Sequence, residues 1–294
     1  MTAMQPIKDT PEIKPRKMDF PFSDVTEKFF YANNSIISTY MAALSGTFPP
    51  GEKGFIDSIR LYRDQVSDPE LLEQIKGFIG QEGQHSYQHK QVNIALDELG
   101  LFATRIEKDL EKKITEDKGR LDSRDFLAST VGMEHITAVM AEYLLNNPHI
   151  LEPLTPSVRE LLLWHAVEEI EHKSVAFEVY QSCVGQRRRL HIVMGIQTLL
   201  FVWQVSLYQL SLLRWAKKVP SIKDVVGAAK FFLGKGGLAR NIVGPYLDYF
   251  RKDFHPWDND NRHLIDDWKR ARGYSVETDL ETIEKNSQYS TGAI

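Results

Sequence analysis

Two short motifs in this chain pair a glutamate with a histidine three residues further on. They are Glu82 with His85 and Glu169 with His172. In an α-helix, a spacing of three residues separates two side chains by about 60°, so each pair lies on one helix face. One such pair arises easily by chance, but two pairs on long helices are the arrangement by which a helical bundle holds two metal ions. The motifs therefore predict a binuclear metal site.

A bundle site of this kind also takes one glutamate from each of two further helices. Glu134 fits because most of its neighbours in residues 131–136 are apolar or small, and a buried carboxylate without a partner is costly. A bond from Glu134 to a nearby histidine or arginine is the alternative. Glu52 is the candidate for the fourth carboxylate, with Glu73 and Glu27 as rivals, because the helix dipole alone favours an acidic residue at a helix start.

The second motif has a further histidine one turn before it. His165, Glu169 and His172 stand at positions i, i+4 and i+7. These positions fall within about 60° of arc on a helix, so all three side chains can reach one centre. His165 is therefore also a candidate metal ligand.

Other polar residues near the motifs are expected to have supporting roles. His89 faces the same way as Glu82, and Glu168 lies at the edge of the face that carries the ligands of the last helix. We expect these two residues beside the ligands, where they would orient them or relay protons. His135 is expected to be support or surface, and Glu171 is expected to be solvated, as is Glu178.

Glutamate oxygen and histidine nitrogen in a set of six or seven ligands favour iron or manganese. Zinc prefers four ligands and fewer carboxylates. We therefore expect two metal ions, iron first and manganese as the alternative. Such a pair could reduce dioxygen or activate water for hydrolysis, and the spacing does not choose between the two reactions.

These residues carry a resemblance to the family of predicted metal-dependent hydrolases over roughly residues 20–268. The matching stretches are Pro49-Pro50-Gly51-Glu52, Gln81-Glu82-Gly83-Gln84-His85-Ser86, Met133-Glu134-His135, the run from Trp164 to Phe177, and Phe254-His255-Pro256-Trp257. The resemblance implies a metal-dependent enzyme and strengthens the assignment of Glu52.

The order of the candidate ligands is also similar to that in ferritin-like di-iron enzymes of the p-aminobenzoate N-oxygenase type. This resemblance implies a ferritin-like bundle with seven ligands: Glu52, Glu82, His85, Glu134, His165, Glu169 and His172. It includes the third histidine, which ordinary ferritin-like sites lack. A long apolar segment from Leu190 is a departure from that group, and it leaves the transfer of an amine substrate open.

Three functions follow from these features. The first is a di-iron oxygenase or oxidase that acts on a small aromatic or acyl substrate and takes electrons from an external donor, since the chain shows no recognisable flavin or nicotinamide motif. The alternative is a binuclear hydrolase in which a metal-bound hydroxide attacks and Glu168 acts as base. The third is a metal-storing or membrane-associated structural protein.

Helices must position these residues, because several apolar runs are too long for strands and strand-type alternation is missing. An all-α bundle is expected, with helices over about 27–44, from Pro49–Gly51 onward, over about 69–99, from Ser123 to before Pro148, and from Pro156 to about Val184. We expect residues 21–185 to form the metal-binding bundle and 186–270 to extend it within the same domain. Residues 1–20 are expected to be a flexible lead-in, and residues 271–294 a polar tail.

The segment Leu190 to Leu213 is almost wholly apolar, and it is long enough to cross a bilayer. Because glutamines interrupt it, we expect a buried helix of the bundle, with membrane packing and a dimer interface as alternatives. Basic residues flank it, so the stretch 187–218 could also meet anionic lipid head groups.

Composition limits the remaining possibilities. The formal net charge of −4 gives no general attraction to nucleic acid, and the single cysteine, Cys183, excludes an intramolecular disulfide. The residues at the start of the chain lack the apolar run of a signal peptide, so we expect a cytoplasmic protein, with membrane association as a further possibility.

Overall fold

The computed structural model describes residues 10–274, and within them every regular element is helical, as predicted. The α-helices are α1 (Ser35–Arg60), α2 (Pro69–Glu98), α3 (Ala103–Lys118), α4 (Ser123–Asn146), α5 (Pro156–His172), α6 (Val175–Cys183), α7 (Arg187–Trp215), α8 (Ile222–Leu233), α9 (Leu238–Asp248) and α10 (Arg262–Ala271). Short 3₁₀ helices lie at Phe22–Asp24, Arg63–Gln65, Pro148–Leu151 and Pro256–Asp258.

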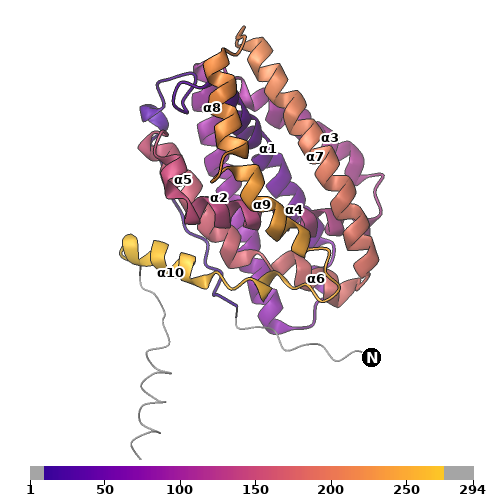
Figure 1. Ribbon diagram of the computed structural model, residues 1–294. Helices are drawn as coiled ribbons and strands as arrows, with labels where there is room; N and C mark the ends of the chain where they lie inside the picture. The colour runs from indigo at the N-terminus through magenta and orange to yellow at the C-terminus, as the bar shows by residue number, and fades with distance from the viewer. Residues whose placement is uncertain (1–9, 275–294) are drawn as a thin grey trace, which may run out of the picture.

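Four long helices form the centre of the molecule (Figure 1). Helix α1 packs along α2, α4 packs along α5, and the two pairs meet through α1–α4 and α2–α5 contacts. Apolar side chains fill the space toward both ends of this bundle, in two clusters of buried residues. The seven ligand candidates identified in the sequence all come from these four helices, so the bundle fixes their relative positions.

Helix α1 differs from its prediction at both ends. We expected one helix over about 27–44 and a second one starting at Pro49–Gly51, but α1 runs unbroken through both prolines. Its start is set by Asn34, whose side-chain oxygen accepts two backbone N–H groups of the first turn. Ala32 and Asn33, just before this cap, have φ of 47° and 53°, which is incompatible with a right-handed helix. The expected earlier start is therefore wrong.

Pro49 fits inside α1 because α2 supplies the hydrogen bond that this proline removes. Pro49 has no N–H, so the carbonyl of Ser45, four residues earlier, loses its donor within the helix. The Nδ2 group of Asn93 donates to that carbonyl at 3.2 Å, and its Oδ1 accepts from the Ser45 hydroxyl at 2.7 Å. Asn93 is fully buried. This contact lets α1 continue to Glu52, which lies one turn further on.

The boundaries of α2 and α4 are confirmed. Asp68 caps α2 through a bond from Glu70 N–H, and Gly100, just after the helix, has the positive φ of 82° that suits glycine. Asp122 caps α4 in the same way. In contrast, α3 had no prediction: its sequence is mostly charged, and it is held through two buried residues, Ala103 and Ile106, that pack beneath α1.

The expected single helix from Pro156 to about Val184 is two helices. Helix α5 ends at His172, and α6 begins at Val175. The C-terminal part of the chain binds at the break, where the Trp257 indole N–H donates to the Ser174 hydroxyl at 3.1 Å. The break therefore coincides with a long-range contact, which sequence periodicity could not reveal.

Helix α7 is not the buried bundle helix that we expected. Among the described residues it is the one helix long and apolar enough to cross a membrane, yet only 17% of its most apolar window is buried. One side packs on α1 and α4, and the other side is open. The core interpretation is wrong because the bundle covers only one face of this helix.

The N-terminal segment differs from its prediction, and part of the C-terminal one lies outside the described residues. Residues 10–20, which we expected to be flexible, lie against α2: a Cβ on Gly77 would come within 2.3 Å of the Ile13 carbonyl, and one on Gly80 equally near Pro15. The predicted polar tail, 271–294, lies outside the described residues from 275 on. The predicted division into 21–185 and 186–270 stays a prediction.

Replacement of Asn93 by leucine tests how α1 accommodates its prolines. Asn93→Leu keeps most of the side-chain volume but leaves the Ser45 carbonyl without a donor, so the free energy of unfolding should fall by about 1–3 kcal/mol in denaturant titration. Gln65→Ala is the control, since the amide of Gln65 is exposed and its bond to Leu61 is long, at 3.4 Å. Equal losses in both variants would contradict this role of Asn93.

Candidate metal centre

Four glutamates from four different helices meet inside the bundle. Glu52 comes from α1, Glu82 from α2, Glu134 from α4 and Glu169 from α5, and each is at most 4% exposed. Three buried histidines join them: His85 from α2, with His165 and His172 from α5. The structure thus brings the seven ligand candidates together in one cluster.

Most of the oxygen and nitrogen atoms that could bind a metal in this cluster are buried and have no hydrogen-bond partner. They are both carboxylate oxygens of Glu52, of Glu82 and of Glu134, with Glu169 Oε2, His85 Nδ1 and His172 Nε2. Nε2 of His172 lies 3.1 Å from a Glu82 oxygen without the geometry of a hydrogen bond. Buried polar atoms are normally paired, so unpaired donors that all face one point indicate a site for cations.

All of the candidate ligands except Glu134 fall into overlapping groups of three, in each of which the atoms lie within 4.8 Å of one another, and His89 joins one of these groups. One group is Glu82, Glu169 and His172, and another is His85, His165 and Glu169. Glu169 belongs to both groups. Shared carboxylates are what two adjacent ions require, so the described residues fit a binuclear centre of oxygen and nitrogen ligands.

A carboxylate and an arginine hold the ring of His85. Its Nε2 pairs with Glu168 at 3.0 Å, which leaves Nδ1 to face the cluster. Arg16 in turn donates to Glu168 at 2.9 Å. Burial raises the pKa of Glu168 to about 6, although Arg16 works in the opposite direction. This outer pair fixes which nitrogen of His85 is offered to a metal.

His172 and His165 are held in the same manner. The Nδ1 of His172 bonds the Gln81 amide oxygen at 2.9 Å, and Gln81 donates to Glu171 at 2.8 Å. The Nδ1 of His165 bonds His89 at 2.8 Å, whose other nitrogen meets the Ser45 hydroxyl at 3.0 Å. Each histidine of the cluster therefore keeps one nitrogen pointing inward.

The negative charges of the buried carboxylates are balanced by cations or by protons. Burial raises the pKa of Glu52 well above its ordinary value, and the carboxylates of Glu82 and Glu169 raise it further. The pKa of Glu134 is also raised, again mainly by burial. Burial would lower the pKa of His172, but Glu169 and Glu134 outweigh it and raise that pKa well above the ordinary range. These shifts show that the cluster favours added positive charge, either as protons or as bound cations.

Several residues considered in the sequence lie elsewhere. Glu73 is exposed and pairs with Lys76, and Glu27 is exposed as well, so neither rival of Glu52 reaches the cluster. His135 contacts the carbonyl of Pro245 on α9. Glu178 is bonded by His255 at 2.6 Å rather than solvated.

The sequence interpretation missed three residues that hold the candidate ligands in place from outside the cluster. Glu171, which we expected to be solvated, is 1% exposed and receives two bonds from Arg16. Arg16 comes from residues that we expected to be flexible, and Gln81 was noted only as part of a motif. The one available signal was position: Gln81 and Glu171 are each next to a ligand glutamate or histidine in the chain.

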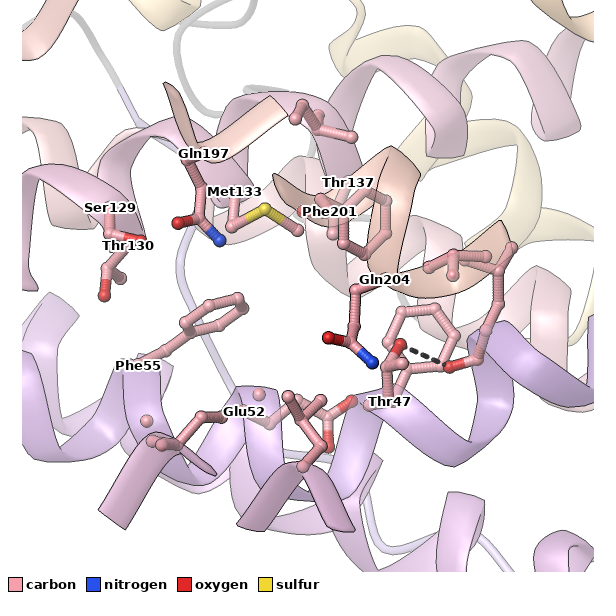
Figure 2. Close-up of a pocket in the computed structure, with 18 of the residues that line it drawn as sticks. Thr47, Glu52, Phe55, Ser129, Thr130, Met133, Thr137, Gln197, Phe201 and Gln204 are labelled. Carbon is pink, nitrogen blue, oxygen red and sulfur yellow. Dashed lines mark hydrogen bonds between the residues drawn. The ribbon is translucent and has the colours of Figure 1, made fainter. Parts of the chain in front are cut away.

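A cavity of about 370 Å³ reaches one side of the cluster. Glu52, His165 and Glu169 line its inner end, while Glu168 and His85 do not. Figure 2 shows Glu52 on the floor of this cavity, beneath Phe55, Gln197 and Gln204. Its size is within the range of ligand pockets, about 300–1,000 Å³, so a small organic molecule can reach the centre from this side.

Comparison with known proteins gives one match. A family model described as "Predicted metal-dependent hydrolase" matches residues 14–260, which is most of the chain. Neither the curated proteins nor the solved structures contain a match. The match confirms the first of the two resemblances noted in the sequence, whereas the likeness to the p-aminobenzoate N-oxygenases stays a prediction.

Removal of metal should destabilise the fold, and more so as the pH rises. A carboxyl whose pKa is raised by folding contributes stability at low pH that is lost as the pH rises through its folded value, and the same holds for His172. Protons also compete with metal for these ligands. The Tm difference between metal-loaded and chelated protein, measured by calorimetry, should therefore widen from about pH 5 to about pH 8. A difference that narrows over this range would contradict the charge balance described above.

Glu168 should act on metal affinity through His85. Glu168→Gln keeps the side-chain shape but removes the anion that orients the histidine, so metal affinity should fall about 10–100-fold in a competition titration. Glu73→Gln is the control, because Glu73 is an exposed carboxylate on α2. If both variants bind metal as the unmodified chain does, the outer pair has no such role.

Proposed function

The chain belongs to the family of predicted metal-dependent hydrolases, and from this premise we propose that it is a two-ion enzyme that hydrolyses an acyl ester or amide. The proposed ligands are the seven residues of the cluster, and the proposed ions are iron, with manganese as the alternative. The observation that carries the proposal is the set of buried donor atoms without partners at the inner end of an apolar cavity.

The proposed role of each residue follows from its position relative to the cavity. Two ions held there would lower the pKa of a coordinated water and polarise a substrate carbonyl. Glu52 and Glu169 are the two carboxylates of the cluster that line the cavity, so a proton released beside the cluster would pass to one of them. Glu168, which we first considered as the base, lies behind His85 and is bonded to Arg16. Its proposed role is therefore to position His85.

The cavity suits a substrate with an apolar body and a polar end. Its wall is formed by side chains such as Phe55, Met133 and Phe201, which exclude water. Two amides, Gln197 and Gln204, interrupt this wall, and the oxygen of Gln204 accepts a long bond from Lys113 at 3.4 Å. We assign the amides to the polar group of the substrate and the apolar wall to an acyl or aromatic part.

Oxidation by dioxygen is the second candidate, favoured by the composition of the ligand set. Four glutamates and three histidines form a carboxylate-rich, high-coordination environment that suits iron, which can change its charge. The order of these ligands also resembles that of the p-aminobenzoate N-oxygenase type. In this case an external electron donor would be needed as a partner.

One experiment separates the two reactions. The metal-loaded protein is supplied with p-nitrophenyl esters of increasing acyl length, with and without oxygen. Hydrolysis predicts release of nitrophenol that is equal in both atmospheres and abolished by chelator. Oxygen uptake by the reduced protein, with no metal-dependent ester cleavage, would overturn hydrolysis in favour of the second candidate.

A matched pair of glycine variants tests whether the cavity is the substrate site. A Cβ on Gly51 meets no atom within 4 Å, and Gly51 lines the cavity, so Gly51→Leu places an apolar side chain in its space. We expect unchanged metal content and a loss of about 100-fold in kcat/KM for long esters, since misplaced substrate reacts slowly. Gly83→Leu is the control, because Gly83 is equally open but lies on the exposed side of α2. Equal activity of the two variants would contradict this assignment.

A further inference from the structure

The outer face of α7 is an uncovered apolar surface. The buried residues of α7 are Leu190, Met194, Val205, Tyr208 and Leu212. The opposite face carries exposed apolar side chains: Ile192, Ile196, Leu199, Val202, Trp203 and Leu210, each more than half exposed. At 100° per residue these six lie within about 120° of arc. Between residues 190 and 213 no charged residue interrupts this face. Single exposed apolar residues are common, but a stripe along a whole helix marks an interaction site.

The stretch of chain that contains this face is strongly basic. Residues 187–248 contain ten Lys or Arg and two Asp, although the whole chain has a net charge of −4. One of the two acids, Asp224, is buried in the cap of α8. The exposed basic residues are Arg188, Arg214, Lys217, Lys223, Lys230, Lys235 and Arg240. Arg187 and Arg189 are engaged within the protein, by the Arg251 carbonyl and by two aspartates respectively.

Helix α7 lies flat on the bundle, so it is not a free membrane span. It is anchored near its C-terminal end by Tyr208, which donates to Asp109, and by Gln209, which donates to the carbonyl of Ile36. Near the N-terminal end of α7, Leu190 is fully buried against the rest of the protein. Figure 1 shows α7, α8 and α9 in front of α1 and α4, and α8 adds further exposed apolar residues such as Ile222 and Val225. An apolar face with basic flanks, held parallel to a surface, is the pattern of an interfacial helix.

Charge favours a lipid surface over a second copy of the chain. A two-fold dimer places the same patch of both copies face to face, so their basic flanks would repel one another. Anionic head groups attract these flanks, and each Lys or Arg near such a surface adds to binding. Trp203, 64% exposed in the middle of the stripe, is a residue type that prefers the membrane–water interface.

We propose that the α7 face docks into the interface of an anionic lipid bilayer. The cavity then lies beside the membrane surface, because Leu200, Phe201 and Trp203 belong both to α7 and to the cavity wall. An acyl substrate can pass from the bilayer toward Glu52 without crossing water. Only the passage of an acyl substrate rests on the proposed function. Docking of the α7 face itself requires neither bound metal nor a reaction.

The test is flotation of the full-length protein with vesicles of phosphatidylcholine alone or mixed with phosphatidylserine, at low and high salt. We expect binding to the anionic vesicles that weakens in high salt. Ile196→Glu should lower the partition coefficient about tenfold or more, because it removes one apolar side chain that would insert into the bilayer. Ile94→Glu is the matched control, since Ile94 on α2 is 50% exposed and Ile196 is 55% exposed.

The basic flank is tested separately. Arg214→Glu with Lys217→Glu should lower the partition coefficient about 30-fold, whereas Lys76→Glu should not.

Binding is measured without substrate, so its result is independent of the proposed reaction. Circular dichroism and metal content check that each variant is folded. Absence of binding to either vesicle would overturn the proposal, as would equal losses in Ile196→Glu and Ile94→Glu. A chain that sediments as a dimer, becomes monomeric on Ile196→Glu and ignores vesicles would assign the face to a second copy instead.

Discussion

Four carboxylates that face one another away from water can coexist only if positive charge lies between them. Burial already disfavours the charged form of each group, and mutual repulsion adds to this cost, as the raised pKa values of Glu52 and Glu134 show. Two divalent cations offset both effects at once, whereas protons do so only in part. The rest of the bundle can be understood as the means of keeping these four side chains together and their donor atoms unpaired.

The surrounding contacts serve that requirement. The outer partners of His85, His165 and His172 each occupy one ring nitrogen and leave the other for the centre. Asn93 allows α1 to pass through Pro49 and still deliver Glu52 to the right depth. Among the described residues, the cavity reaches the cluster from the side where α7 lies. The proposed substrate therefore arrives from that side.

Local signals in the sequence were enough for much of this site. The spacing of Glu82 with His85 and of Glu169 with His172 predicted shared helix faces, and caps such as Asp68 fixed two helix starts. Features that depend on distant partners could not be predicted. Arg16 reaches Glu168 across 152 positions of the chain, and the break after His172 coincides with a contact from Trp257. The exposure of α7 was also missed, because an apolar sequence fits a core and a lipid surface equally well.

The most direct measurement is the metal content of protein purified without chelators, by elemental mass spectrometry. The account predicts about two transition-metal ions per folded chain, and a clear loss of metal in Glu82→Gln and Glu169→Gln, which remove ligands from the shared groups. Folded protein with no metal, or variants that keep the full metal content, would contradict the binuclear centre on which the rest depends.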